Sequence, residues 1–408
     1  MSARKSRVVI VGGNFAGLVA ASRLSSDYDV TVVDARKDFE WTPNIHELIS
    51  GVKKRASVVL PRADCVARYG HRFVHDVVTR IDTDSSSIST GGGLVLSYDA
   101  CLIAAGSQRT TFGVDGADEH ALNLRLVDDA VGIAEKLDRL AARKRRASIV
   151  IVGGGVSGIE ALGEILRRRS RGDDFNIHVV ELGSRILGQQ PASLADDAHN
   201  RIAPFRVALH TESAISRVEA RTVVLDSGAR LAADLCIWST GMVLPEFLRD
   251  AGLKTGDDEW LPVGHTLQSR HADNVFVAGD CAELPNPIRK QAYYAMDMGA
   301  IAGDNIARLL GNRPLRRFCP MPMPMLISFG DITTWLVAGD SIVASPLLAV
   351  GKEGVYQANM ACLASARDPL QFSADAIERA LMSARRLLLP QLTLDSVLNG
   401  LAGSRIVP

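Results

Sequence analysis

The sequence predicts an α/β protein with parallel sheets, in which one βαβ unit occurs twice. Three observations predict this class. Short β-branched runs end in glycine-rich turns, each turn precedes a stretch with helical spacing of apolar residues, and the pattern recurs about 140 residues later. A chain of 408 residues is also long for a single core, which predicts two or three domains.

The first unit lies at the N-terminus. Its expected elements are a strand (8–11), a helix (16–24) and a second strand (30–33). The turn reads GGNFAG (12–17), with Asn14 where a G-x-G-x-x-G turn has its middle glycine, and Asp34 follows the second strand. Such a turn lets backbone amides approach a pyrophosphate, and the acid after the second strand binds a ribose diol.

Asn14 is the unusual residue of this turn. Asparagine tolerates uncommon backbone dihedrals better than most residues, and its amide can donate to a phosphate oxygen. We therefore expect Asn14 to lie against a pyrophosphate.

The second unit carries the complete motif. Its expected elements are a strand (148–152), a turn GGGVSG (153–158), a helix (159–166) and a strand (177–180). Glu181 closes the second strand, as Asp34 does in the first unit. Two copies, each with its terminal acid, imply two bound dinucleotides.

Three further segments support the same arrangement. Residues 97–106 (SYDACLIAAG) and 234–241 (DLCIWSTG) each read as a polar residue, an apolar strand and a turn of small residues. Residues 274–280 (NVFVAGD) form an expected buried strand that brings Gly279 and Asp280 to its carboxyl end, where ligands bind in parallel α/β sheets. Asp280 can also be read as the N-cap of a following helix.

In this order, the motifs resemble the two-dinucleotide-domain flavoprotein oxidoreductases of the pyridine nucleotide-disulphide oxidoreductase superfamily. The resemblance extends over residues 6–313 and is greatest to type II NADH dehydrogenases and apoptosis-inducing-factor-like quinone reductases. It implies two Rossmann-like domains, with an NAD domain inserted in an FAD domain, and a small C-terminal α+β domain. The implied boundaries are 1–112 and 243–313 (FAD), 113–242 (NAD) and 314–408 (C-terminal).

The resemblance also implies the cofactor-binding residues. FAD is expected at Gly12, Gly13, Gly17, Asp34 and Asp280, and NADH at Gly153, Gly155, Gly158 and Glu181. The other expected cofactor-binding residues accompany these motifs: Asn14, Phe15, Ala16, Ala35, Arg36, Thr42, Pro43, Ala105, Gly106, Val156, Ser157, Gly241, Gly279, Ala292 and Tyr293. No metal site is expected.

Glu160 is the expected catalytic residue, two positions beyond the last glycine of the second turn. The resemblance implies that it orients the nicotinamide and relays protons; alternatively, its carboxylate caps its own helix. Glu164, one turn later, is a weaker candidate. The resemblance places residues 40–48 (EWTPNIHEL) near the flavin, where His46 and Glu47 form either a hydrogen-bonded pair at a helix start or a redox-active pair.

The acid after the second strand of the second unit also predicts the coenzyme. Glu181 can bind the adenosine 2′-hydroxyl of NADH but repels a 2′-phosphate, so NADH is expected over NADPH. Arg185 is near enough in sequence to reduce this preference.

The electron acceptor is predicted from what the sequence lacks. The six cysteines form no C-x-x-C pair, which disfavours a disulphide reductase and suits a reducing compartment. Type II NADH dehydrogenases carry A-Q-x-A-x-Q-x-G beside the flavin, whereas residues 292–299 read AYYAMDMG. The K-x-A-Y-x-A form at residues 290–295 instead resembles the ferroptosis-suppressor group of quinone reductases.

We therefore expect an enzyme that passes electrons from NADH through FAD to a quinone-like acceptor. One alternative is a ferredoxin-type reductase, whose docking patch for a small redox protein would be the basic runs 143–146 and 167–171; these runs also suit solvated helix faces. Another is a redox-sensing or interaction protein, in which bound FAD and NADH act as a charge-transfer switch on the oligomeric state. A formal net charge of zero argues against a nucleic-acid partner.

The C-terminal quarter is open to two interpretations. Residues 321–339, which begin MPMPM, line a hydrophobic tunnel or form the core or dimer face of a small domain. Residues 374–389 have an apolar stripe bordered by arginines, so this helix lies on an anionic membrane or packs on its own domain. No apolar run of eighteen residues and no signal peptide is recognised, so we expect a cytoplasmic protein. We also expect a homodimer. If the helix at residues 374–389 lies on the membrane, the protein is peripheral to the cytoplasmic face of that membrane.

Overall fold

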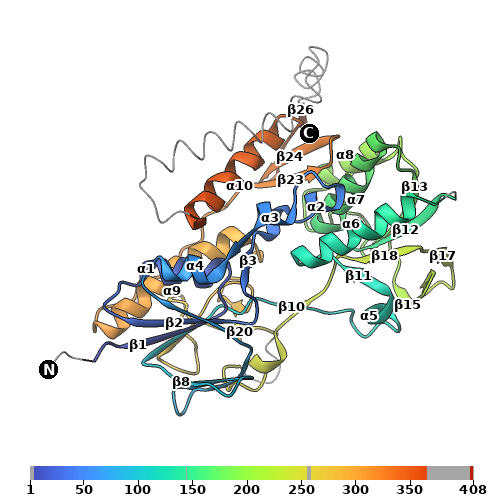
Figure 1. Ribbon diagram of the computed structural model, residues 1–408. Coiled ribbons are helices and arrows are strands. Elements are labelled where there is room, and N and C mark those ends of the chain that lie inside the picture. Colours follow the sequence, from blue (N-terminus) through green and yellow to red (C-terminus); the bar gives the residue numbers. More distant parts are fainter. Residues whose placement is uncertain (1–3, 144, 255–258, 365–404, 408) are drawn as a thin grey trace. The chain divides into compact units, whose positions relative to one another are not determined.

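The computed structural model describes residues 4–143, 145–254, 259–364 and 405–407, and the chain divides into two compact units (Figure 1). Unit 1 comprises Met1–Glu40, Val59–Arg109 and Met242–Met321. Unit 2 comprises Trp41–Val58, Thr110–Gly241 and Pro322–Pro408. The expected boundaries of the FAD, NAD and C-terminal domains stay a prediction.

The centre of unit 1 is a parallel sheet in which the described strands follow the order β21-β9-β1-β2-β5. Their bounds are Val275–Val277 (β21), Ala100–Ile103 (β9), Arg7–Val11 (β1), Asp29–Asp34 (β2) and Arg72–His75 (β5). The β-branched runs of β1 and β2 are buried almost throughout, as strands covered on both faces require. The strands expected at 8–11, 30–33 and within 274–280 are confirmed.

Two helices of unit 1 pack closely because glycines face the partner backbone. Helix α1 (Phe15–Arg23) lies beside α9 (Ala292–Leu310). A Cβ on Gly299 would overlap the carbonyl oxygen of Ala16, and one on Gly303 would lie 2.7 Å from the carbonyl oxygen of Ala20. The carboxyl end of the sheet and the beginnings of these helices are thus held together.

Smaller elements complete unit 1. An antiparallel sheet contains β6 (Val78–Asp82), β7 (Ser87–Thr90) and β8 (Val95–Ser97). The paired strands are β3 (Asp38–Glu40) with β4 (Val59–Pro61), β10 (Gln108–Arg109) with β19 (Met242–Val243), and β20 (Leu261–Pro262) with β22 (Ala282–Glu283). The remaining helices are α4 (Arg62–Ala67) and η3 (Glu246–Leu248).

Unit 2 repeats the topology of unit 1. Its described parallel strands follow the order β11-β18-β12-β13-β14. Their bounds are Ala121–Asn123 (β11), Leu235–Trp238 (β18), Ala147–Val152 (β12), Phe175–Val180 (β13) and Val207–His210 (β14). Because β9-β1-β2-β5 and β18-β12-β13-β14 correspond strand for strand, the repeat predicted from sequence is a repeat of structure.

The other elements of this half of unit 2 surround that sheet. Its longer helices are α6 (Val127–Ala141), α7 (Val156–Arg167) and α8 (Ala192–Ile202). The shorter helices are η1 (Thr42–Asn44), α2 (Glu47–Ser50), α3 (Arg55–Val58), α5 (Ala117–His120) and η2 (Arg168–Arg171). An antiparallel sheet contains β15 (Ile215–Glu219), β16 (Thr222–Leu225) and β17 (Arg230–Ala232).

The C-terminal part of unit 2 is an antiparallel sheet covered by a helix (Figure 1). Its described strands are β23 (Met325–Phe329), β24 (Thr333–Ala338), β25 (Ser341–Ser345) and β26 (Arg405–Val407), and the helix is α10 (Leu348–Ala364). Ile327, Phe329 and Trp335 are fully buried. This favours the core interpretation for that part of residues 321–339.

The helix expected at residues 374–389 lies outside the described residues. Among the residues that the structure describes, no helix is long and apolar enough to cross a membrane.

Candidate functional site

The two glycine-rich turns share one geometry. Gly12 and Gly153 both have φ +98°, a conformation that favours glycine. A Cβ on Gly17 would overlap the carbonyl oxygen of Gly12, and a Cβ on Gly158 would overlap that of Gly153. Each helix therefore starts directly against its strand, with its first amides at the carboxyl edge of the sheet.

The acids at the ends of β2 and β13 also act alike. The amide nitrogen of Gly13 donates to Asp34 over 2.7 Å, and that of Gly154 donates to Glu181 over 2.7 Å. Each carboxylate therefore fixes the turn that it faces. Gly154 is absent from the residues expected to bind NADH, because a contact made by a backbone amide cannot be recognised from the residue type.

Arg62, which sequence reasoning missed, completes the first turn. Its guanidinium is buried, pairs with Asp34 at 2.9 Å and donates to the carbonyl oxygen of Gly13 at 2.6 Å and to that of Arg36. Burial lowers the pKa of Arg62, and the charge of Asp34 opposes this. Nothing near Arg62 in the sequence marks it, since its partners are 28 and 49 positions away.

The middle position of the motif does not require glycine. Asn14 has φ −99° and ψ −147°, outside the regular helical and extended regions, and Gly155 is extended with φ −70° and ψ −174°; neither residue has the positive φ that favours glycine. These dihedrals agree with the tolerance for uncommon backbone conformations that was expected of asparagine. The side chain of Asn14 makes two long contacts of 3.4 Å with the backbone of Glu40.

The ends of β9 and β21 come together at the same edge of unit 1. A Cβ on Gly279 would lie 3.5 Å from that of Ala16, and one on Gly12 would lie 2.9 Å from Cα of Ala105. Asp280 accepts a hydrogen bond of 3.0 Å from Ser107. Because β22 follows Asp280 and α9 begins only at residue 292, the N-cap interpretation of Asp280 is wrong.

The structure places the remaining expected residues of the first site as follows. Phe15 opens α1 and packs edge-on against Phe39, with ring centroids 5.4 Å apart. Ala35 and Arg36 follow β2, Gly106 follows β9, and Ala292 and Tyr293 open α9. Thr42 and Pro43 open η1 in unit 2, so their proximity to the first turn stays a prediction.

The second turn has a comparable support from β18. The hydroxyl of Ser239 donates to the carbonyl oxygen of Val152 over 2.7 Å, and a Cβ on Gly153 would lie 3.0 Å from Cβ of Thr240. Gly241 follows with φ +85°. Val156 and Ser157 lie in the first turn of α7.

Arg185, near Glu181 in sequence, is held by its own loop. Its Nη2 donates to the carbonyl oxygens of Gln190 at 2.8 Å and Gly188 at 3.0 Å. The guanidinium is thus engaged with backbone oxygens, which reduces its capacity to bind a 2′-phosphate.

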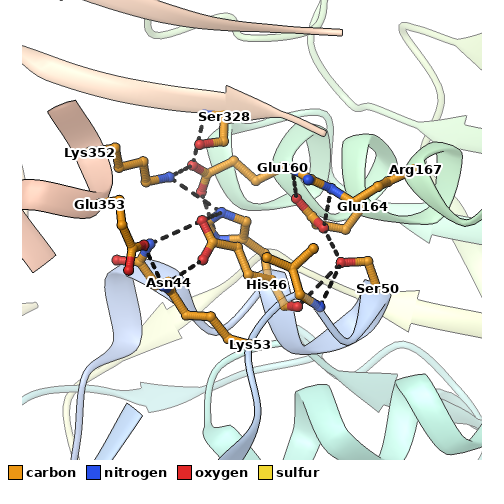
Figure 2. A network of polar contacts seen from close by, with 12 residues as sticks. Asn44, His46, Ser50, Lys53, Glu160, Glu164, Arg167, Ser328, Lys352 and Glu353 are labelled. Atoms are coloured by element: carbon orange, nitrogen blue, oxygen red, sulfur yellow. Dashed lines mark hydrogen bonds and ion pairs between the residues drawn. The ribbon is translucent and has the colours of Figure 1, made fainter. Parts of the chain in front are cut away.

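A buried polar network in unit 2 surrounds Glu160 (Figure 2). Helix α7 and strand β23 approach closely because Gly163 and Gly330 face each other: a Cβ on Gly163 would lie 2.6 Å from the carbonyl carbon of Phe329. The amide of Ser328 then donates to Glu160 over 3.1 Å. Glu160 is 8% exposed and bonds to β23, so the interpretation that it caps its own helix is wrong.

Lys352 of α10 and His46 complete the surroundings of Glu160. Lys352 Nζ lies 2.6 Å from Glu160 Oε1 and 3.3 Å from His46 Nε2, and His46 Nδ1 lies 3.4 Å from Glu160 Oε2. Burial, followed by the charge of Lys352, lowers the pKa of His46 well below its ordinary value, so the imidazole is neutral at physiological pH. Because the Lys352 ammonium can only donate, Nε2 accepts, and the proton of His46 sits on Nδ1 facing Glu160.

Both carboxyl groups of α7 bind protons more tightly than usual. Burial raises the pKa of Glu160, although Lys352 opposes this. Burial also raises the pKa of the fully buried Glu164 to about 7, against the opposing charge of Arg167. Glu164 accepts hydrogen bonds from Ser50 and Arg167. Its carboxyl therefore titrates near neutral pH.

His46 and Glu47 do not pair with each other. His46 Nε2 lies 4.0 Å from Glu47 Oε1, which is too long for a hydrogen bond, so the helix-start hydrogen-bond interpretation is wrong. Glu47 instead contacts Lys53 at 3.3 Å, and Asn44 donates to it over 3.1 Å. Lys53 also lies 2.5 Å from Glu353.

Sequence reasoning missed Ser50, Lys53, Arg167, Lys352 and Glu353. One signal was present for two of them: Lys352 and Glu353 are the charged residues of the otherwise uncharged stretch 348–364. Their burial, together with Tyr356 and Met360, shows that the inner face of α10 carries this pair.

Several arginines of the two basic runs form ion pairs, whereas Arg169 and Arg171 are exposed. Arg145 and Arg143 pair with Asp234, and Arg146 pairs with Asp174. In the second run, Arg168 is 4% exposed and pairs with aspartates at 2.6 Å, and Arg167 belongs to the buried network. Arg167 and Arg168 therefore do not form a solvated helix face.

Comparisons with known proteins agree with this geometry. The model of a family described as pyridine nucleotide-disulphide oxidoreductase matches residues 6–299. The chain is 28% identical over 378 residues to the demethylphylloquinone reductase NdbB of Synechocystis, covering 87% of this chain and 92% of that protein. It is 24% identical over 400 residues to the type II NADH:quinone oxidoreductase of Haemophilus influenzae, covering 85% and 90%. The structure of NDH2 from Plasmodium falciparum in complex with NADH superposes with a TM-score of 0.81 at 16% identity, covering 92% of this chain and 98% of that one.

Proposed function

The chain belongs to the pyridine nucleotide-disulphide oxidoreductase family, and we propose that it transfers electrons from NADH through FAD to a quinone. The observation that carries this proposal is the pair of matching turns, each fixed by an acid through the amide of its second glycine. Two such turns suit two dinucleotides, and the named relatives reduce quinones.

The residues of unit 1 fit FAD. Gly12 and Gly17 allow the first amides of α1 to lie against the carboxyl end of β1, where they can bind a pyrophosphate, and Asp34 stands at the end of β2 for a ribose. Asp280 lies at the same edge, at the end of β21, for the chain that links the flavin to its phosphates. When bound, FAD accepts a hydride from a nicotinamide and passes electrons to an acceptor.

The residues of unit 2 fit NADH. Gly153, Gly155 and Gly158 would receive the pyrophosphate, and Glu181 would bind the adenosine ribose. The engagement of Arg185 with its own loop supports NADH over NADPH, since a 2′-phosphate would meet the carboxylate without that cation.

We propose that Glu160 supplies protons to the reaction. Reduction of a quinone by NADH consumes one proton from solution. Glu160 is buried with a raised pKa, accepts from Lys352 and faces the Nδ1 proton of His46, so a proton can pass between neighbouring groups of this network. Lys352 holds the carboxylate in place and His46 keeps its proton directed at it.

Internal pairing of part of the basic runs weakens the ferredoxin-type alternative. A docking patch for an acidic redox protein needs unpaired surface cations. Arg145 and Arg146 meet carboxylates and Arg168 is buried, which leaves Arg169 and Arg171 as the exposed arginines of the second run. The sensing alternative predicts slow turnover, which the experiment below separates from the proposal.

Quinones with long tails reside in the membrane, so we propose that the protein works on the cytoplasmic face of the membrane as a peripheral homodimer. The expected amphipathic helix at 374–389 would provide the attachment. Co-sedimentation with lipid vesicles and size-exclusion chromatography test these two parts separately.

The proposed function is tested by steady-state oxidation of NADH by the FAD-loaded protein with menadione or ferredoxin as acceptor. Rapid turnover with menadione and none with ferredoxin is the expected result. Turnover with ferredoxin alone would favour the alternative reductase, and a stable reduced complex with neither acceptor consumed would favour the sensor. Glu160→Gln should keep both cofactors bound and lower kcat at least about tenfold.

A further inference from the structure

A cavity of about 520 Å³ lies at the amino end of the parallel sheet in unit 1. Arg7, Asp29 and Arg72 begin β1, β2 and β5, and all three line it. Because these strands are parallel, their amino ends lie at the edge opposite to the one that carries the glycine turn. The cavity is therefore separate from the proposed FAD site.

The cavity is strongly basic. Arg4, Lys5, Arg7 and Arg72 line it, and Asp29 is the acid among its described lining residues. Asp99 lies 3.0 Å from Arg4 and 3.6 Å from Arg7. Four cations against these two carboxylates leave a local charge of +2, in a chain whose formal net charge is zero.

Two buried polar atoms in the walls lack partners. His71 is 7% exposed; its Nε2 lies 3.0 Å and 3.1 Å from carbonyl oxygens at the end of α1, whereas its Nδ1 has no hydrogen-bond partner. The Nε of Arg7 is likewise buried without a partner. Buried polar atoms are nearly always hydrogen-bonded. Nε2 of His71 donates to the carbonyl oxygens, so its Nδ1 is an acceptor, and Nε of Arg7 is the unpartnered donor of the two that favours an anion nearby.

We propose that this cavity binds a small phosphorylated anion. Arginine forks bind phosphate through paired hydrogen bonds, and both Arg7 and Arg72 line the cavity. Nε and Nη2 of Arg72 each also donate to the Thr31 hydroxyl, at 3.2 Å and 3.0 Å, which leaves the Nη1 hydrogens of Arg72 for a ligand. Its volume falls within the roughly 300–1,000 Å³ of small-molecule sites, which leaves room for an organic group beside the phosphate. Such a phosphate belongs either to a soluble metabolite or to a lipid headgroup. The site does not depend on the proposed electron transfer.

The test compares binding by the FAD-loaded wild type and the Arg7→Gln/Arg72→Gln variant. Glycerol 3-phosphate is titrated calorimetrically, and sedimentation is measured with vesicles of phosphatidylcholine with and without phosphatidylglycerol. Arg80→Gln is the matched control, because Arg80 is an exposed arginine of the same unit that pairs with Asp82. If the double variant fails to fold, Arg4→Gln/Lys5→Gln replaces it at the chain's exposed beginning.

For a soluble ligand, the dissociation constant for glycerol 3-phosphate rises at least about tenfold in the double variant and not in the control. For a lipid headgroup, sedimentation with phosphatidylglycerol vesicles falls in the double variant while glycerol 3-phosphate binds neither protein. Equal behaviour of the wild type and both variants in the two assays would overturn the proposal.

Discussion

Lys352 Nζ lies 2.6 Å from Glu160 Oε1, and each of these side chains is only 11% exposed. A cation from α10 thus meets a carboxylate that α7 and β23 have enclosed. The net effect of the surroundings is still to raise the pKa of Glu160, because burial outweighs the attraction of the ammonium.

Replacing the lysine should raise that pKa further. In Lys352→Met the carboxylate loses its nearest cation, so Glu160 holds its proton to a higher pH. The limb of the kcat–pH profile that reports Glu160 is the one that disappears in Glu160→Gln. We expect this limb to move to higher pH in Lys352→Met. The measurement is kcat with menadione across the pH range in which the FAD-loaded variants stay folded.

The stability of the double variant is the control for this pair. Each single variant leaves one buried charge without its partner, which costs about 3–5 kcal/mol when the charge cannot be neutralised. Lys352→Met/Glu160→Gln removes both charges and should be more stable than either single variant in urea unfolding. Additive losses would show that the two side chains do not interact in solution.

Glu164 should make stability depend on pH. Its pKa is about 7 in the fold against an ordinary 4.5, so the folded state binds this proton more tightly than the unfolded state. Stability is therefore lost as the pH rises from about 4.5 to about 7, by up to about 3 kcal/mol. In Glu164→Gln this loss should be absent, and Arg167 keeps its ion pair with Asp331 at 2.5 Å.

The measurement is urea unfolding of both proteins at about pH 5 and pH 8. Glu135→Gln serves as the matched control, since Glu135 is an exposed helical glutamate whose nearest ion pair is 3.9 Å long. An identical change in the free energy of unfolding for wild type and Glu164→Gln would show that Glu164 titrates normally.

Glu181 should determine the choice of coenzyme. Its carboxylate accepts a hydrogen bond from the amide of Gly154 and would repel a 2′-phosphate. Glu181→Ala should therefore weaken the binding of NADH more than the binding of NADPH. We expect kcat/KM for NADH to fall at least about tenfold and the ratio between the two coenzymes to narrow. Glu219→Ala, which removes a surface acid of the same unit, should leave that ratio unchanged. A constant ratio in Glu181→Ala would assign the preference to other residues.

The parts that could be predicted from sequence are those whose cause is local. In both units the strand packs closely against the helix that follows it because glycines stand at fixed spacing. Gly12 and Gly17 have this spacing in the first turn, and Gly153 and Gly158 have it in the second. The acids after β2 and β13 could be recognised for the same reason. Both sheets were therefore predictable from short segments of chain.

The network around Glu160 could not be predicted because its members come from three distant segments. His46 is 114 positions from Glu160, and Lys352 is a further 192 positions along the chain. From sequence, His46 was expected to hydrogen-bond its neighbour Glu47. In the folded protein, His46 contacts Glu160 and Lys352 instead. Arg62 shows the same limit in unit 1, since burial beside Asp34 depends on how α4 folds back.

Asn14 and Gly17 should respond oppositely to substitution. Glycine can adopt the backbone conformation of Asn14, so Asn14→Gly should retain bound flavin. In Gly17→Ala the new methyl would overlap the carbonyl oxygen of Gly12, which forces α1 away from β1 and should abolish flavin binding. Gly132→Ala is the matched control, because a Cβ there meets nothing within 4 Å and alanine favours helix α6 by up to about 1 kcal/mol. The ratio of flavin to protein absorbance after purification decides: flavin lost from Asn14→Gly would make the asparagine itself a flavin ligand.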